Sequence, residues 1–186
     1  MTLEKIKTAL RSEINPKINN FGKNKPASVL IIIYNDPPKI LMTKKPVSMV
    51  QHGGEISFPG GKYIQSDTDL LETALRETKE ETGLQISKSD VIGQLNQVTT
   101  LNSGFTILPF VCVLDKINNL VANSEVETFL EIPFHTFLET LENDIDPNHN
   151  SIKEMYIFTF ENNLIWGASA RMLKQIKDNL TKQNSF

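Results

Sequence analysis

The sequence contains a single cysteine, Cys112, among its 186 residues. One cysteine excludes a disulfide within the chain and a zinc site built from several thiolates. Cys112 is flanked by Val111 and Val113, so we interpret it as a small apolar residue of a strand.

A long hydrophobic run is also missing. The longest one extends from Val29 to Tyr34 and is far shorter than the roughly 20 apolar residues that a membrane helix needs. The chain starts with Met-Thr-Leu-Glu-Lys, without the apolar core of a signal peptide. These absences predict a cytoplasmic protein that has no membrane partner.

The sequence has no excess of positive charge either, because 19 basic residues face 22 acidic ones and the net charge is −3. This balance argues against a nucleic-acid partner. With 39% hydrophobic and 22% charged residues, the composition is that of an ordinary globular domain. We predict a helical extension over residues 1–25 and one domain over residues 26–182.

Strands and helices are mixed along the chain without a strict alternation. Apolar spacing predicts helices at 2–14, 67–81, 134–142 and 167–180, and strands at 27–34, 39–44, 91–98, 105–114, 126–132 and 155–160. We expect 45–57 to be irregular and 58–61 to form a tight loop. Asp67 or Thr68 can cap the second helix, and Gly83 can end it. The pattern favours an α/β (α+β) fold with a mixed sheet and packed helices.

The most informative segment is the predicted helix at 67–81. Glu77, Glu80 and Glu81 are spaced i, i+3, i+4, so they project from one face and can converge. A hard divalent cation such as Mg²⁺ binds carboxylate oxygens and would remove their repulsion. Arg76 lies four residues before Glu80 and can orient its carboxylate. The alternative interpretation is an acidic helix face in solvent.

Two features favour the metal site over a solvated face. Gly60 and Gly61 precede the helix, and their backbone could approach a ligand closely or expose a carbonyl to a metal. The other side of the helix is apolar, so packing would hold the carboxylates in place.

The segment from Gly61 to Leu84 resembles the Nudix box, in which glycine and an acidic residue precede Arg-Glu-bulky-x-Glu-Glu-x-Gly-bulky. Asp67 stands where the general pattern has glutamate, with one more residue before the arginine, and Thr78 replaces a bulky aliphatic residue. The remaining positions match: Gly61, Arg76, Glu77, Glu80, Glu81, Gly83 and Leu84.

The longer spacer with Asp67 is similar to the coenzyme A pyrophosphatase branch of this family. That branch also has an upstream signature, which this sequence matches at His52, Gly54, Glu55 and Phe58-Pro59-Gly60-Gly61. Two arginines of the signature are replaced, one by Lys45 and the other by Val50. Valine cannot bind a phosphate as arginine does, and lysine supplies only a point charge.

The resemblance implies a Nudix-type α/β/α sandwich and hydrolysis of a diphosphate bond with Mg²⁺ or Mn²⁺. It implies that Glu77, Glu80 and Glu81 hold the metal, and that a metal-bound water becomes the nucleophile. Arg76, Glu80 and Glu125 are the candidate catalytic residues, with Glu125 as the base or, alternatively, a surface residue. The candidate substrate-binding residues are Lys45, His52, Gly60 and Gly61.

Three functions follow from this resemblance. Hydrolysis of coenzyme A or acyl-coenzyme A to 3′,5′-ADP and (acyl-)4′-phosphopantetheine is the first. Hydrolysis of ADP-ribose, NADH or another nucleotide is the second, and nucleotide binding without catalysis is the third. The expected partner is a nucleotide resembling coenzyme A, and the family resemblance allows a homodimer.

Overall fold

The computed structural model describes residues 1–18, 21–49, 53–100, 103–145 and 155–183. Its helices are α1 (Leu3–Leu10), α2 (Leu70–Thr82), α3 (Phe134–Glu139) and α4 (Gly167–Lys182), with a short 3-10 helix, η1 (Lys88–Asp90). Its strands are β1 (Lys25–Tyr34), β2 (Lys39–Lys44), β3 (Ile56–Ser57), β4 (Gly60–Lys62), β5 (Val91–Gln94), β6 (Val98–Thr99), β7 (Phe105–Leu114), β8 (Thr128–Pro133), β9 (Glu142–Asn143), β10 (Tyr156–Phe160) and β11 (Asn163–Ile165).

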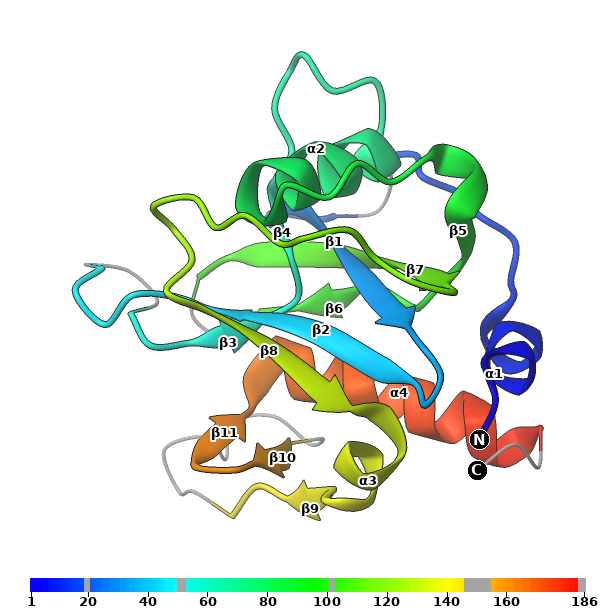
Figure 1. The fold of residues 1–186 in the computed structure, drawn as a ribbon. Coiled ribbons are helices and arrows are strands. Elements are labelled where there is room, and N and C mark those ends of the chain that lie inside the picture. The colour runs from blue at the N-terminus through cyan, green and yellow to red at the C-terminus, as the bar shows by residue number, and fades with distance from the viewer. Residues whose placement is uncertain (19–20, 50–52, 101–102, 146–154, 184–186) are drawn as a thin grey trace.

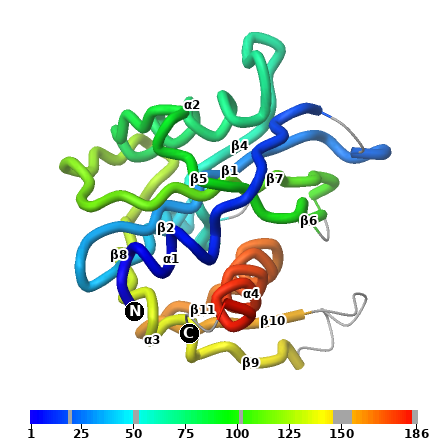
Figure 2. Tube along the Cα trace, turned by 90° about the vertical axis from the view of Figure 1, so that its right-hand side faces the viewer, coloured from blue at the N-terminus to red at the C-terminus, as the bar shows by residue number. Residues whose placement is uncertain are grey.

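The centre of the fold is a mixed sheet with the order β3-β2-β1-β7-β5, to which β4, β6 and β8 also pair. Among the described strands only β1 and β7 pair in parallel, and they pair along their whole length. Figure 1 shows α2 on one face of this sheet and α1 and α4 on the other, and Figure 2 shows the same layers from the side. The predicted α/β/α sandwich with a mixed sheet is therefore confirmed.

Strand β1 is buried on both faces, which explains its continuous apolar run. Val29, Ile31 and Ile33 join the core shared with α1 and α4. The side chains between them, including Leu30 and Ile32, join the core beneath α2.

Helix α1 ends at Leu10, so the helix predicted over 2–14 is four residues too long at its C-terminal end. The chain becomes extended at Arg11 and follows the edge strand β5, where the Ser12 backbone N–H donates to the Ile92 carbonyl at 3.3 Å. Pairing with a sheet edge replaces the remaining helical turn. Ile6 and Leu10 are buried in the same core as α4, so this segment packs against the sheet domain.

Helix α2 begins at Leu70, and its N-cap is Asp69, whose side chain accepts a hydrogen bond from the Glu72 backbone N–H at 2.8 Å. The predicted caps, Asp67 and Thr68, were therefore wrong. The predicted end was correct, because Gly83 has the left-handed conformation, with φ 74°.

Other differences concern short elements. The segment 56–62 contains β3 and β4, although we expected irregular chain and a loop. The predicted strand at 91–98 is divided into β5 and β6. The predicted helix at 134–142 ends at Glu139, and β9 and β11 were not predicted. Strands of two or three residues have no periodicity of their own, since their partners define them.

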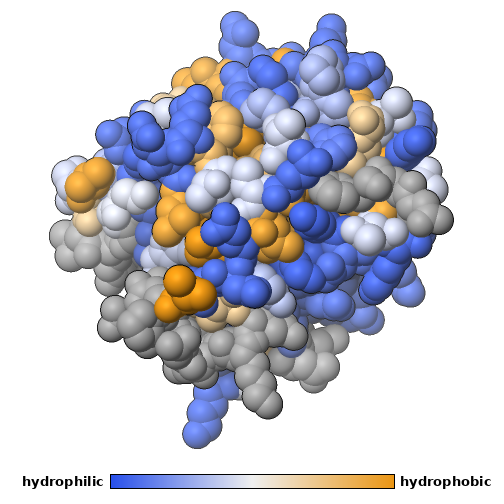
Figure 3. Space-filling view, turned by 90° about the horizontal axis from the view of Figure 1, so that it is seen from below, coloured by the Kyte–Doolittle hydropathy of each residue, from blue (hydrophilic) through white to orange (hydrophobic). Residues whose placement is uncertain are grey.

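Figure 3 views the molecule from below Figure 1, on the side of α4 and the small sheet β11-β10-β9. Outside the grey atoms, hydrophobic side chains on this face are interrupted by hydrophilic ones. Among the described residues, no helix combines the length and the apolar character that crossing a membrane requires.

Candidate functional site

The Gly60–Gly61 segment reaches α2 because β1 and β2 diverge. The end of β1 pairs with β2 at Ile32–Tyr34, whereas its earlier part pairs with β4. The end of β2 pairs with β3. The segment 56–62 thus fills the gap between the two strands and passes below the face of α2 that carries Glu77 and Glu81.

Both glycines lie in close contacts that leave no room for a Cβ in the present arrangement. Gly60 has φ +153°, and a Cβ there would lie 2.3 Å from the Ser28 carbonyl oxygen. A Cβ on Gly61 would lie 2.4 Å from the carboxyl carbon of Glu77. The backbone of the loop therefore lies directly against the Glu77 carboxylate.

Three glutamates of α2, Glu77, Glu80 and Glu81, differ in burial. Glu81 is only 4% exposed, and it accepts a hydrogen bond from the Gly60 backbone N–H at 3.2 Å. The Glu77 side chain is 20% exposed and that of Glu80 is 54% exposed. Glu77 and Glu81 thus line the glycine loop, whereas Glu80 lies at the solvent side.

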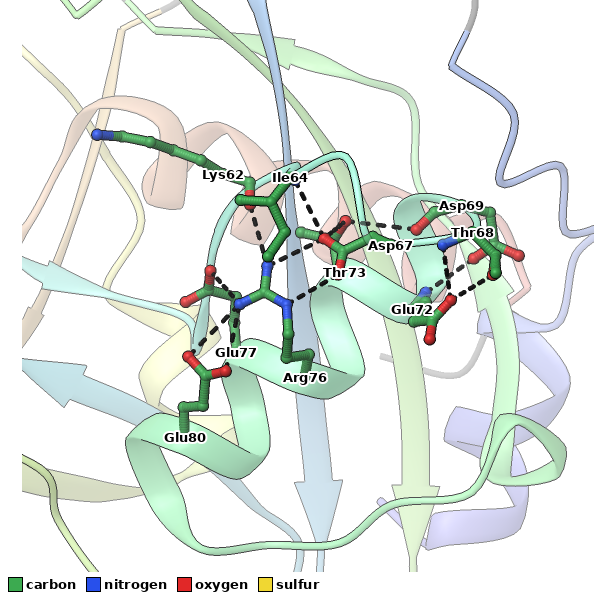
Figure 4. A network of polar contacts seen from close by, with 10 residues as sticks. All are labelled: Lys62, Ile64, Asp67, Thr68, Asp69, Glu72, Thr73, Arg76, Glu77 and Glu80. Atoms are coloured by element: carbon green, nitrogen blue, oxygen red, sulfur yellow. Dashed lines mark hydrogen bonds and ion pairs between the residues drawn. The ribbon is translucent and has the colours of Figure 1, made fainter.

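Arg76 joins Asp67 to the glutamates (Figure 4). Its Nε donates to Asp67 Oδ1 at 2.8 Å and its Nη2 donates to Oδ2 at 3.0 Å. Its Nη1 donates to Glu77 at 2.8 Å and to Glu80 at 3.4 Å. The predicted contact between Arg76 and Glu80 is present, but the contact with Glu77 is shorter.

Asp67 is the anchor of this network. Its side chain is 2% exposed, and it also accepts hydrogen bonds from the Thr73 hydroxyl at 2.8 Å and the Ile64 backbone N–H at 3.2 Å. The Arg76 hydrogen bond holds the pKa of Asp67 below its ordinary value. Asp67 was noted in the sequence as a motif position, but its function as the partner of Arg76 was missed. The two residues are nine positions apart, and Asp67 precedes the helix. Their contact could therefore be predicted only if the conformation of the intervening turn were known.

Burial and like charges determine the electrostatics of the glutamates. Burial raises the pKa of Glu81 to about 7; the Gly60 N–H and Lys45 oppose this rise, and Glu77 and Glu125 add to it. Burial also raises the pKa of Glu77, against the effect of Arg76. An ionised pair at this position is therefore costly without a cation.

Lys45 and Glu125 reach the same site from the far end of the sheet. Lys45 follows β2 and Glu125 precedes β8, and these two strands pair in antiparallel fashion. The Lys45 Nζ lies 3.5 Å from Glu125 Oε2. Since both charges act on the pKa of Glu81, the structure brings the predicted base and the predicted substrate lysine close to the carboxylate helix.

The donor set fits a hard divalent cation, because it consists of carboxylate oxygens whose repulsion a cation would relieve. Within the described ranges, no three His, Cys, Asp or Glu side chains are arranged closely enough to hold a metal ion. In this conformation Arg76 lies between Glu77 and Glu80 and neutralises part of their charge. The metal assignment therefore stays a prediction, as do the functions of the individual residues. His52 and Val50 lie outside the described residues.

Comparisons with known proteins agree with this geometry. A model of the NUDIX domain family matches residues 24–174. A Yersinia enterocolitica protein named "Uncharacterized Nudix hydrolase NudL" is 32% identical over 166 residues, which cover 87% of this chain and 85% of that protein. A protein of the same name from Yersinia pestis is 32% identical over 157 residues, covering 82% of this chain and 78% of that protein.

Solved structures show the same fold. A MutT/nudix family protein from Enterococcus faecalis has a TM-score of 0.62 and 14% identity, covering 92% of this chain and 66% of that one. The NUDIX domain of Shewanella oneidensis NrtR, solved with ADP ribose, has a TM-score of 0.59 and 14% identity, covering 97% of this chain and 99% of that one. Because the family model matches most of the chain and the Yersinia relatives align with most of it, the chain belongs to the Nudix hydrolase family.

Proposed function

We propose that this Nudix hydrolase cleaves the diphosphate bond of coenzyme A or acyl-coenzyme A, forming 3′,5′-ADP and (acyl-)4′-phosphopantetheine. One observation is the main support for diphosphate chemistry: Glu77 and the buried Glu81 lie against a glycine loop, with Glu125 and Lys45 close enough to affect the pKa of Glu81. The narrower choice of coenzyme A rests on the spacer with Asp67 and on the matches from His52 to Gly61.

In this proposal Glu77, Glu80 and Glu81 hold Mg²⁺ or Mn²⁺. The bound cation would supply charge neutralisation of the diphosphate and a water of lowered pKa. Arg76, held by Asp67, orients Glu77 and Glu80. The backbone at Gly60 and Gly61 leaves room for the diphosphate to approach the helix.

Glu125 is the proposed base that takes a proton from the attacking water. Its side chain is 54% exposed and pairs with Lys45, so it can move while remaining near the carboxylates. We assign Lys45 to the substrate phosphates, which would compete with Glu125 for its ammonium group. His52 is the fourth substrate-binding residue in this proposal.

A second function within the same chemistry is hydrolysis of ADP-ribose, NADH or another nucleotide. The replacement of two signature arginines by Lys45 and Val50 favours this second function, because weaker phosphate binding reduces the specificity for coenzyme A. The NrtR domain from Shewanella was solved with ADP ribose, which is the ligand to compare. Binding without catalysis is disfavoured, since all three glutamates of the box are present.

A substrate panel tests the proposal. Coenzyme A, ADP-ribose, NADH and a nucleoside triphosphate are incubated with Mg²⁺ or Mn²⁺, and products are separated by chromatography. We expect kcat/KM to be highest for coenzyme A. Preference for ADP-ribose by roughly tenfold, a difference of about 1.4 kcal/mol, would refute the branch assignment.

The location and partners remain predictions from the sequence. We propose a cytoplasmic enzyme with a small nucleotide as its partner and without a nucleic-acid or membrane partner. A homodimer is also a prediction, and size-exclusion chromatography with light scattering tests it.

A further inference from the structure

Lys62 connects the candidate site to the opposite face of the sheet. Its backbone carbonyl accepts a hydrogen bond from Arg76 Nη2 at 3.2 Å, so its main chain borders the carboxylate network. Its side chain, however, points away from the glutamates (Figure 4).

The strand register explains this direction. Gly61 pairs with Ser28 and faces Glu77, whereas the next residue, Lys62, pairs with Ala27. Successive residues of a strand face opposite sides, so Lys62 lies on the face of the sheet that α4 covers.

An aromatic ring lies beside the ammonium group of Lys62. The Nζ is 5.6 Å from the ring centroid of Phe105, the first residue of β7. Phe105 pairs directly with Lys25 of β1, and Lys25 is on the same face as Ala27. Two lysines and one partly exposed ring therefore share the end of the sheet next to the glycine loop.

Lys62 and Lys25 carry positive charge at this end of the sheet. In the part of the chain that the structure describes, no carboxylate lies within salt-bridge distance of Lys62 or Lys25. The guanidinium of Arg171 adds a positive charge nearby. It donates a hydrogen bond to the carbonyl of Thr99, and the backbone N–H of the next residue, Thr100, donates to the carbonyl of Phe105.

We propose that Lys62 determines specificity by binding a phosphate on the ribose of the substrate, with its ammonium group positioned over the ring of Phe105. A nucleotide whose diphosphate lies at Gly60 and Gly61 can extend past β4 to this face. There it meets the ammonium group of Lys62, which has no acidic partner among the described residues and lies over an apolar ring. The substrate class is thus a nucleoside diphosphate derivative with an additional ribose phosphate.

This inference rests on the proposed function for the position of the diphosphate, but its test does not need turnover. Calorimetry measures the binding of 3′,5′-ADP and of 5′-AMP in the presence of Mg²⁺. The wild-type chain is expected to prefer 3′,5′-ADP by roughly tenfold, which is the strength of one charge-assisted hydrogen bond. Substitution Lys62→Gln is expected to reduce this ratio to about one, and Lys62→Arg to retain most of it.

Lys116→Gln is the matched control, because Lys116 is exposed and follows the other end of β7. It removes the same charge and is expected to leave the ratio unchanged. The inference is overturned if the wild type does not discriminate between the ligands, if Lys62→Gln keeps the preference, or if Lys116→Gln loses it equally. A preference for 3′,5′-ADP without hydrolysis of coenzyme A would instead refute the proposed function and leave this inference standing.

Discussion

Replacing Glu81 by glutamine should change how the stability of the metal-free protein depends on pH. Glu81 is 4% exposed, and its only direct hydrogen-bond donor in the described residues is the Gly60 N–H. Glutamine keeps a carbonyl oxygen for that donor and has almost the same shape. The substitution therefore removes the charge while leaving the packing intact.

The direction of this pH effect follows from the pKa of Glu81 in the folded state. For Glu81 it is about 7, above the ordinary value of 4.5, so the folded protein binds more protons than the unfolded chain between these values. Stability is therefore highest at or below the lower pKa and decreases as the pH rises through the higher one. Since each pKa unit corresponds to about 1.4 kcal/mol, the loss amounts to roughly 3.5 kcal/mol at most.

Urea denaturation with a chelator present, at about pH 5 and about pH 8, measures this difference. The glutamine variant should be about 1–3 kcal/mol more stable than the wild type at the higher pH and nearly equal at the lower one. Glu13→Gln, at an exposed position of the N-terminal segment, is the control for the change in net charge. Parallel pH profiles for the wild type and the Glu81 variant would refute the claim that Glu81 is a buried, costly charge.

Three further substitutions test other parts of the account. Thr78→Val should stabilise the protein by about 1 kcal/mol in urea denaturation, because the buried Thr78 hydroxyl has no hydrogen-bond partner in the described structure. An unchanged or lower stability of the variant would contradict this prediction. Gly61→Ala should lower kcat by roughly 100-fold with little change in Tm, since the alanine Cβ displaces the Glu77 carboxylate. A variant that keeps the kcat of the wild type would show that the close contact is irrelevant. Asp67→Asn should lower the free energy of unfolding by about 2–4 kcal/mol near neutral pH and have no effect in acid, because Arg76 holds the pKa of Asp67 below its ordinary value. An equal loss of stability at low pH would contradict this assignment.

Helix α2 could be predicted from sequence because its signals are local. Apolar spacing located it, Gly83 marked its end, and the three glutamates followed from their positions on one face. The long strands β1 and β7 were found for the same reason, since their apolar runs are continuous.

Contacts between distant segments were not predictable in the same way. Strands β3 and β4 exist only because β1 and β2 diverge and offer unpaired edges. The proximity of Lys45 and Glu125 depends on the pairing of β2 with β8, which no local pattern signals. The end of α1 likewise depends on the edge of β5, far along the chain.

The function of Glu81 in diphosphate cleavage is tested most directly by the turnover of coenzyme A with Mg²⁺. The wild type, Glu81→Gln and Glu13→Gln are compared, and products are identified by mass spectrometry. We expect 3′,5′-ADP and 4′-phosphopantetheine from the wild type and the Glu13 variant, and a decrease in kcat of at least about 100-fold for the Glu81 variant. Wild-type turnover by Glu81→Gln would contradict the assignment of Glu81 to the reacting site. Absence of diphosphate cleavage by the wild type, with coenzyme A and every other nucleotide of the panel, would contradict the proposed chemistry.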